Sequence, residues 1–441
     1  MEITPLLDHN VILANLAQPV NFALRLKAAE IDSQRERPLA FCLVLDRSGS
    51  MSGAPLYQAK EAAARVVKNL RPGDQFALVT FDDTAETLVP LQVVRDKAGL
   101  RRRIDAIQPG GSTNLTGGWM LGRDQLRTAP ADYARRLLLL SDGHLNHGIT
   151  EPEQVRVVVA GGLEHDRIRT SCLGFGGGYD EDLMGELARC TNGQFYDATS
   201  AEKLPAIFAA ELDGLQKLSA QNIRVRVRPL PFCEQLEPLG DNPCVELPDG
   251  RTEYALGDLV SGEEQIACWA MEVLPLPCID GQPVASLEGE PLLEIEVLYD
   301  EVTASGIESH TFEQTVRVQA TQDPGRIQRN GQVLQWVSLQ RTGKVMDEVT
   351  RHMDQGNLPG ALELLDAALV KLAEYPDVQG IQEAAQPLER LRDQLKSDRY
   401  DARSRKHSRY SARSYRKMKS MELWSLEEAS PSFKQPPSDK R

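Results

Sequence analysis

Three short segments of the sequence place carboxylates and hydroxyls beside apolar or amphipathic runs. Asp46, Ser48 and Ser50 alternate in the segment Asp46-Arg-Ser-Gly-Ser-Met51, directly after the apolar run 41–45. The segment Gly110-Gly-Ser-Thr-Asn114 precedes a helical pattern, and Ser141-Asp-Gly143 follows the apolar run 137–140. If the apolar runs are strands of one parallel sheet, all three segments are loops at the edge where open α/β sheets bind ligands.

Every donor that these loops offer is an oxygen atom. Carboxylate and hydroxyl oxygens suit Mg²⁺ and Mn²⁺, whereas zinc prefers sulfur and nitrogen ligands. The sequence therefore predicts a site for Mg²⁺ (or Mn²⁺), built from the side chains of Asp46, Ser48, Ser50, Thr113 and Asp142.

The stretch 39–218 has the pattern of a doubly wound, mostly parallel α/β sheet of Rossmann-like type, because short apolar runs alternate with amphipathic stretches. Strands are expected at 41–45, 75–81, 136–141, 169–173 and 194–196. Helices are expected at 55–70, 96–107, 115–126, 152–161, 180–190 and 201–218. This order would bring the three oxygen-rich loops to one edge.

The flanking residues follow a different pattern. Apolar and polar residues alternate along 20–27, 223–228 and 293–297, as in half-buried antiparallel strands. We predict a small β-sandwich formed by 1–38 and 219–322, with the α/β domain inserted between these segments. Leucines at helical spacing then predict a helical hairpin or three-helix bundle over 323–397.

The predicted metal-binding residues resemble those of a known family. The pattern Asp-x-Ser-x-Ser with a later Thr and a later Asp is similar to the metal-ion-dependent adhesion site of von Willebrand factor A domains. The resemblance covers about 39–218 and includes Arg71-Pro-Gly-Asp74 and Phe81-Asp-Asp83. The flanking segments resemble those of bacterial intracellular proteins that contain this domain.

The resemblance implies specific roles for the site residues. Ser48, Ser50 and Thr113 would bind the metal through their hydroxyls, while Asp46 and Asp142 would act mainly through water molecules. A dication held in this way stays under-neutralised, so it would attract an Asp or Glu of a partner protein. Arg47, His144 and His147 border the site and are candidate partner-binding residues; the alternative is that they are ordinary exposed loop residues.

The function that follows is a non-enzymatic, metal-dependent adaptor or scaffold. Relatives of this kind commonly serve as adaptors, sometimes beside AAA+ ATPases or kinase and phosphatase systems, which are therefore candidate partners. A metal-dependent phosphohydrolase is the alternative, although the hydroxyl-rich donor set and the lack of a nucleophilic Asp motif argue against it. No dinucleotide, Walker or zinc-protease motif is complete in this sequence.

Composition limits the remaining classes of function. The 441 residues carry a formal net charge of −14, which makes nucleic acid an unfavourable ligand for the body of the chain. The seven cysteines form no CxxC pair, and no run approaches the roughly 20 apolar residues of a membrane span. We therefore expect a cytoplasmic protein with reduced thiols and no transmembrane segment.

The segment 398–441 is strongly basic at its start and is expected to be a flexible tail. Basic residues alternate with serines, of which Ser404, Ser408, Ser411 and Ser414 are candidate phosphorylation sites. One interpretation is a docking element for an anionic surface or nucleic acid. The other is a solubilising tail that folds onto the acidic body.

Overall fold

The computed structural model describes residues 1–30, 38–130, 133–142, 146–175, 178–198, 204, 207–208, 211, 217–276, 278–279, 282–283, 289–303, 306–375, 378 and 380–418. The chain forms two compact units. One contains Met1–Glu30, Ser219–Glu301 and the chain from Ile307, and the other contains Ile31–Leu218 with Val302–Gly306. No helix among the described residues has the length and apolar character needed to cross a bilayer.

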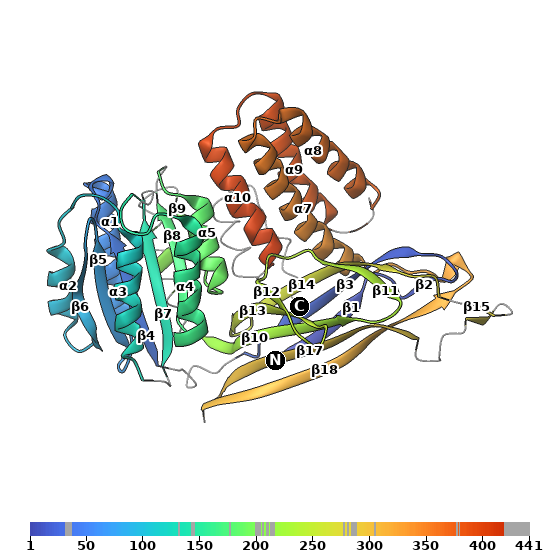
Figure 1. The fold of residues 1–441 in the computed structure, drawn as a ribbon, viewed down its shortest axis with the longest axis horizontal. Helices are drawn as coiled ribbons and strands as arrows, with labels where there is room; N and C mark the ends of the chain where they lie inside the picture. The colour runs from blue at the N-terminus through green and yellow to red at the C-terminus, as the bar shows by residue number, and fades with distance from the viewer. Residues whose placement is uncertain are drawn as a thin grey trace, which may run out of the picture. The chain divides into compact units, whose positions relative to one another are not determined.

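The second unit is the predicted doubly wound α/β domain (Figure 1). Its six strands lie in the order β6-β5-β4-β7-β8-β9, and all neighbours are parallel except β6, which runs antiparallel to β5. The strands are β4 (Leu39–Asp46), β5 (Gln75–Phe81), β6 (Ala85–Val93), β7 (Ala134–Ser141), β8 (Arg169–Phe175) and β9 (Phe195–Ala198). Strand β6 was not predicted from the sequence, because it is an edge strand whose residues are mostly half-buried or exposed.

Helices cover both faces of this sheet. On one face α1 (Ala54–Asn69) and α2 (Lys97–Asp105) pack against apolar residues of β4, β5 and β7. On the other lie α3 (Leu115–Arg127), α4 (Pro152–Asp166) and α5 (Glu181–Cys190). Burial on both faces explains why β4 is apolar along its whole length up to Asp46.

Close packing of α3 depends on a residue without a side chain. A Cβ atom on Gly122 would lie 2.6 Å from Cγ2 of Val44, so α3 can lie directly on the sheet only because Gly122 is a glycine. Trp119 from the same helix is fully buried and donates through Nε1 to the Thr170 hydroxyl at 3.0 Å. The start of α3, which carries the loop of Thr113, is thereby held firmly at the sheet edge.

The first unit contains the predicted β-sandwich (Figure 1). One sheet has the order β1-β3-β14-β11 and the other the order β12-β13-β10-β17-β18-β2, so the N-terminal strands contribute to both sheets. Phe22 and Trp269 stack in the core between them, with ring centroids 5.4 Å apart. The strands are β1 (Glu2–Leu7), β2 (Val11–Leu13), β3 (Gln18–Lys27), β10 (Leu218–Pro229), β11 (Cys233–Pro238), β12 (Cys244–Glu246), β13 (Thr252–Val260), β14 (Glu264–Val273), β17 (Glu290–Thr303) and β18 (Gly306–Thr321), with a short pair β15 (Cys278–Ile279) and β16 (Gln282–Pro283).

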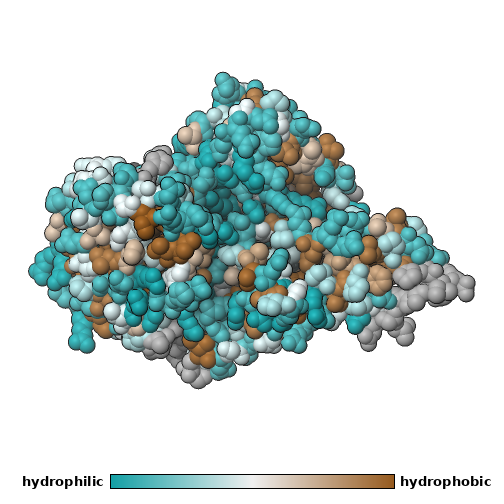
Figure 2. All heavy atoms as spheres, in the orientation of Figure 1, coloured by the Kyte–Doolittle hydropathy of each residue, from teal (hydrophilic) through white to brown (hydrophobic). Residues whose placement is uncertain are grey.

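Helices α7 (Gly331–Asp354), α8 (Leu358–Ala373), α9 (Ile381–Lys396) and α10 (Ala402–Lys417) follow the sandwich. They share a core with β3 and β14, so the helices and the sandwich belong to one unit. Gln340 of α7 is fully buried, and its side chain bonds the backbone of Ile266 and Cys268 in β14. The surface over these helices is mostly hydrophilic in the view of Figure 2.

Helix α10 corrects the prediction of a flexible tail from residue 398. Ala412, Tyr415 and Met418 are buried in the core of the helical region, and α10 packs along α7. Its arginines pair with acidic residues of α7, since Arg405 contacts Asp354 at 2.8 Å and Arg416 contacts Asp347 at 2.9 Å. The basic run taken alone suggests a flexible segment, but the acids that neutralise it lie more than 50 residues earlier in the chain. The alternative interpretation, a segment that folds onto the acidic body, describes this helix better.

Candidate metal site

The first loop of the site begins where β4 ends. The side chain of Asp46 is fully buried and accepts hydrogen bonds from the backbone N–H of Ser48 at 2.8 Å and from the Ser141 hydroxyl at 2.6 Å. Ser48, which is also fully buried, precedes the 3-10 turn η1 (Gly49–Met51). The buried side chain of Met51 anchors this turn against α1.

Hydrogen bonds join the three oxygen-rich loops in pairs. The Ser50 hydroxyl donates to Oδ1 of Asp142 at 2.7 Å and lies 3.1 Å from the Ser48 hydroxyl, which connects the first loop to the end of β7. The N–H of Gly49 donates to the carbonyl of Gly111 at 2.9 Å, which connects the first loop to the loop before α3. The five predicted residues therefore lie on loops that contact one another at one sheet edge.

Asn146 makes the third connection, between the loop before α3 and the loop after β7. Its Oδ1 accepts the backbone N–H of Thr113 at 2.6 Å. Thr113 itself is only 3% exposed. Asn146 was not predicted as a site residue, because nothing in the sequence separates it from other polar loop residues.

Two further residues missed as site components are Asp82 and Asp83, which follow β5. Their side chains pack so closely on Gly110 and Gly111 that neither glycine has room for a Cβ atom. Asp83 also accepts the N–H of Ser112 at 2.7 Å, and this bond lowers the pKa of its carboxyl group. The only sequence signal was the segment Phe81-Asp-Asp83, which the family resemblance included without assigning it a role.

The electrostatic environment of the two predicted carboxylates favours a cation. Burial raises the pKa of Asp46 to about 6, against the opposing hydrogen bonds from Ser141 and Ser48. Burial also raises the pKa of Asp142, and the Ser50 hydroxyl opposes that shift. Among the described residues no Lys, Arg or His forms an ion pair with either carboxylate, although many other acids have such partners. Two desolvated carboxylates with hydroxyls between them form a donor set that fits Mg²⁺ or Mn²⁺.

The predicted partner-binding residues have different environments. Arg47 forms ion pairs with Asp82 at 3.0 Å and Glu86 at 3.7 Å, so its charge supports the neighbouring loop. His147 is exposed, and it contributes to the lowered pKa of the Asp83 carboxyl group. His144 lies outside the described residues. Contact with a partner remains a prediction for all three predicted residues.

The structure limits the predicted phosphorylation sites in α10. Ser408, Ser411 and Ser414 are 3%, 5% and 4% exposed, because they lie on the face of α10 that packs into the helical region. A kinase could not reach them while α10 is docked. Ser404 is partly exposed and lies in the first turn of α10, where its N–H donates to the Asp401 side chain.

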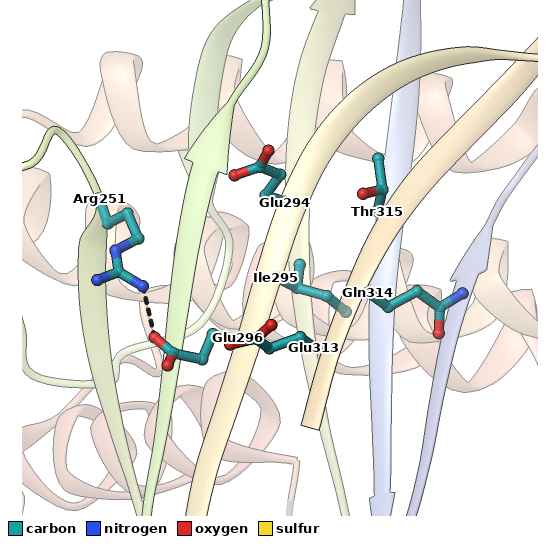
Figure 3. A pocket seen from close by; sticks show the side chains of 7 residues that line it. All are labelled: Arg251, Glu294, Ile295, Glu296, Glu313, Gln314 and Thr315. Atoms are coloured by element: carbon teal, nitrogen blue, oxygen red, sulfur yellow. Dashed lines mark hydrogen bonds and ion pairs between the residues drawn. The ribbon is translucent and has the colours of Figure 1, made fainter. Parts of the chain in front are cut away.

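A separate concavity of about 440 Å³ lies on the sandwich (Figure 3). Arg251 lines it and pairs with Glu296 at 2.6 Å, and Glu296 also accepts from Arg226 at 2.9 Å. Opposite charges on neighbouring strands stabilise a sheet surface. These ion pairs account for the charges of Arg251 and Glu296 in the lining, and we propose no ligand for this concavity.

Comparison with known proteins agrees with the geometry. Residues 41–210 match the model of the von Willebrand factor type A domain. The chain is 25% identical over 305 residues to an uncharacterized protein of Synechocystis sp., a match covering 66% of this chain and 69% of that protein. It is also 31% identical over 160 residues to the bovine inter-alpha-trypsin inhibitor heavy chain H1, covering 34% of this chain and only 18% of that protein.

Two solved structures resemble most of the chain. A von Willebrand factor type A protein from Catenulispora acidiphila superimposes with a TM-score of 0.66 at 16% identity, covering 88% of this chain and 89% of that one. The ArnB paralogue VWA2 from Sulfolobus acidocaldarius gives a TM-score of 0.57 at 15% identity, covering 93% and 98%. At these identities the likeness shows the fold alone. That fold is the expected α/β sheet together with antiparallel sheets and C-terminal helices, which confirms the predicted fold class.

Proposed function

Because the chain is a von Willebrand factor A domain protein, related to bacterial and archaeal proteins of this kind, we propose that it is a metal-dependent protein–protein interaction module. It acts as an adaptor that captures an Asp or Glu side chain of a partner protein. The metal, Mg²⁺ or Mn²⁺, supplies the positive charge for this carboxylate when bound.

The observation that carries the proposal is the hydrogen-bonded group of Asp46, Ser48, Ser50 and Asp142 at the edge of the sheet. The hydroxyls of Ser48 and Ser50, with that of Thr113 on the adjoining loop, would hold the metal directly. Asp46 and Asp142 would act mainly through water molecules. With few charged atoms in direct contact, the dication retains an affinity for an external carboxylate.

The arrangement of the carboxylates favours binding over catalysis. Asp46 already accepts two hydrogen bonds, and Asp142 accepts one from Ser50. Neither is presented to a substrate as a free nucleophile or base, which a phosphohydrolase would need. We therefore propose that the chain is not an enzyme.

We further propose that the protein acts in the cytoplasm. Cys42, Cys172, Cys233 and Cys268 are buried free thiols, as is usual in a reducing compartment. The candidate partners are an AAA+ ATPase or a kinase or phosphatase system, as the family resemblance suggests. The common requirement is an exposed acidic side chain.

The test is affinity capture from the native lysate with Mg²⁺, with a chelator, and with the variant Asp142→Asn. Asp142→Asn keeps the shape of the side chain and removes its charge. The matched control is Asp124→Asn, because Asp124 is exposed on α3 of the same unit and pairs only weakly with Arg127 at 3.7 Å.

We expect a set of proteins that is captured with Mg²⁺ by the wild type and by Asp124→Asn, but is lost with chelator and with Asp142→Asn. Calorimetry with a captured protein should then show a tighter complex in Mg²⁺ than in chelator. A partner affinity that is the same in both conditions would contradict the proposed function.

A further inference from the structure

A pocket of about 240 Å³ lies between α7, α9 and α10, in the unit that does not contain the candidate metal site. Met346 from α7, Leu391 from α9 and the ring of Tyr415 from α10 give it an apolar lining. A cavity of roughly 150 Å³ is enough to hold benzene in another protein. This pocket therefore has room for one substituted ring or a short branched chain.

Two of the hydroxyl groups in the pocket make no hydrogen bond to another described residue. Ser411 is 5% exposed and Tyr415 is 4% exposed, and neither hydroxyl has a hydrogen-bond partner in the part of the chain that the structure describes. Neither hydroxyl oxygen is among the buried atoms closed off from solvent without a partner, so both face the open space of the pocket. There they can donate to a bound group.

One arginine lines the pocket. Arg390 of α9 lines the same pocket, is exposed to solvent, and forms no ion pair among the described residues. Burial raises the pKa of Tyr415 to about 12, although Arg390 acts in the opposite direction, so this phenol stays protonated at neutral pH and can donate. An arginine beside two hydroxyl donors is suited to a carboxylate or phosphate group.

We propose that the pocket between α7, α9 and α10 binds a small amphiphilic anion, with its acidic group at Arg390, Ser411 and Tyr415 and its apolar part against Met346 and Leu391. The ligand bridges α9 and α10. It therefore stabilises the docked position of α10 by binding only that state.

The probes for this site are 4-fluorobenzoate and 4-fluorophenyl phosphate, titrated into the full chain and followed by fluorine NMR. The neutral 4-fluorobenzamide and the cationic 4-fluorobenzylamine have the same ring. We expect saturable binding of at least one anionic probe, at least about tenfold tighter than either of the others. The comparison of the two anions shows whether a carboxylate or a phosphate group fits better.

Three variants locate the site. Tyr415→Phe removes only the hydroxyl and Arg390→Gln removes only the charge, and each should weaken the anion about tenfold or more. Arg392→Gln is the matched control, because Arg392 lies on the same helix but faces Asp366 at 3.3 Å and does not line the pocket. Its affinity should be unchanged.

The proposal is overturned by any of three results. These are no saturable binding of either anion, equal binding of the neutral probe, or equal loss of affinity in Arg392→Gln and Arg390→Gln. Circular dichroism of each variant confirms that the helices are intact before affinities are compared.

Discussion

The docking of α10 on α7 makes a quantitative prediction. Asp347 of α7 is 6% exposed and accepts from Arg416 at 2.9 Å and Arg409 at 3.2 Å, whereas Asp354 lies at the surface and pairs mainly with Arg405 at 2.8 Å. Both acids serve the same helix pair, so Asp347→Asn and Asp354→Asn form a matched set that differs in burial.

Removing one partner of a buried ion pair costs about 3–5 kcal/mol, because the other charge is left unpaired. Arg416 retains Asp241 at 3.3 Å and the carbonyl of Gly240 at 3.2 Å, which reduces this cost. We therefore expect Asp347→Asn to lower the free energy of α10 undocking by about 2–3 kcal/mol. For Asp354→Asn, which is partly solvated, we expect at most about 1 kcal/mol.

Trypsin provides the assay, because α10 contains several arginines and lysines and is cleaved only when it opens. When opening and closing are fast, the cleavage rate follows the population of the open state. The cleavage rate in α10 should rise about 30- to 150-fold in Asp347→Asn and at most about fivefold in Asp354→Asn. Similar rates for both variants, or a wild-type α10 cleaved as fast as an unfolded peptide, would refute the docked helix and restore the flexible tail.

Three further predictions follow from burial. In chelator, Asp46→Ala should lower the free energy of unfolding of the α/β unit by about 2–4 kcal/mol, because it leaves a buried hydroxyl and a buried N–H unpaired. Asp142→Asn should lower it by less than about 1 kcal/mol. Equal losses for the two variants in urea unfolding would contradict this prediction. In thermal melting, Gly122→Ala should destabilise the same unit by about 1–3 kcal/mol through overpacking. The control is Gly161→Ala, whose Cβ would meet only His165 at 3.8 Å. It should leave the stability unchanged or raise it by up to about 1 kcal/mol. The third prediction concerns a thiol reagent at pH 8, with the modified residues identified by peptide mass spectrometry. The exposed Cys244 should react within minutes. The buried thiols, whose pKa is raised by burial, should stay unmodified until the protein unfolds; they are Cys42, Cys172, Cys233 and Cys268.

The α/β domain could be predicted because its signals are local. A strand buried on both faces is a short apolar run, and β4, β5 and β7 were predicted within two residues of their bounds. The oxygen-rich loops end or precede such elements, so placing the strands also places the loops. The sandwich could be predicted for the same reason, since one exposed face imposes alternation along β10.

The parts that could not be predicted depend on contacts between distant residues. The helix α10 has few apolar residues, and it is stable because acids of α7 neutralise it and because Gly343 of α7 lets the backbone at Ala412 approach closely. Likewise, the bond from Thr113 to Asn146 joins residues 33 positions apart that share no motif. Periodicity detects burial of apolar side chains, and it does not detect charge pairs or small-residue contacts.

The direction of one hydrogen bond in the site bears on its proposed role. The Ser50 hydroxyl donates its single proton to Asp142, so it accepts in its 3.1 Å contact with the Ser48 hydroxyl, and one lone pair of Ser50 Oγ remains available. Asp142 orients the Ser50 hydroxyl through this bond, and under the proposed function it would act on the metal through that hydroxyl and through water. Asp46 already accepts hydrogen bonds from the Ser48 N–H and the Ser141 hydroxyl. Under the proposed function it too would contribute its negative charge without direct contact to the metal. Under the proposed function, the chain would supply negative charge near the metal without direct carboxylate contact, and a carboxylate of another protein would fill the position left open.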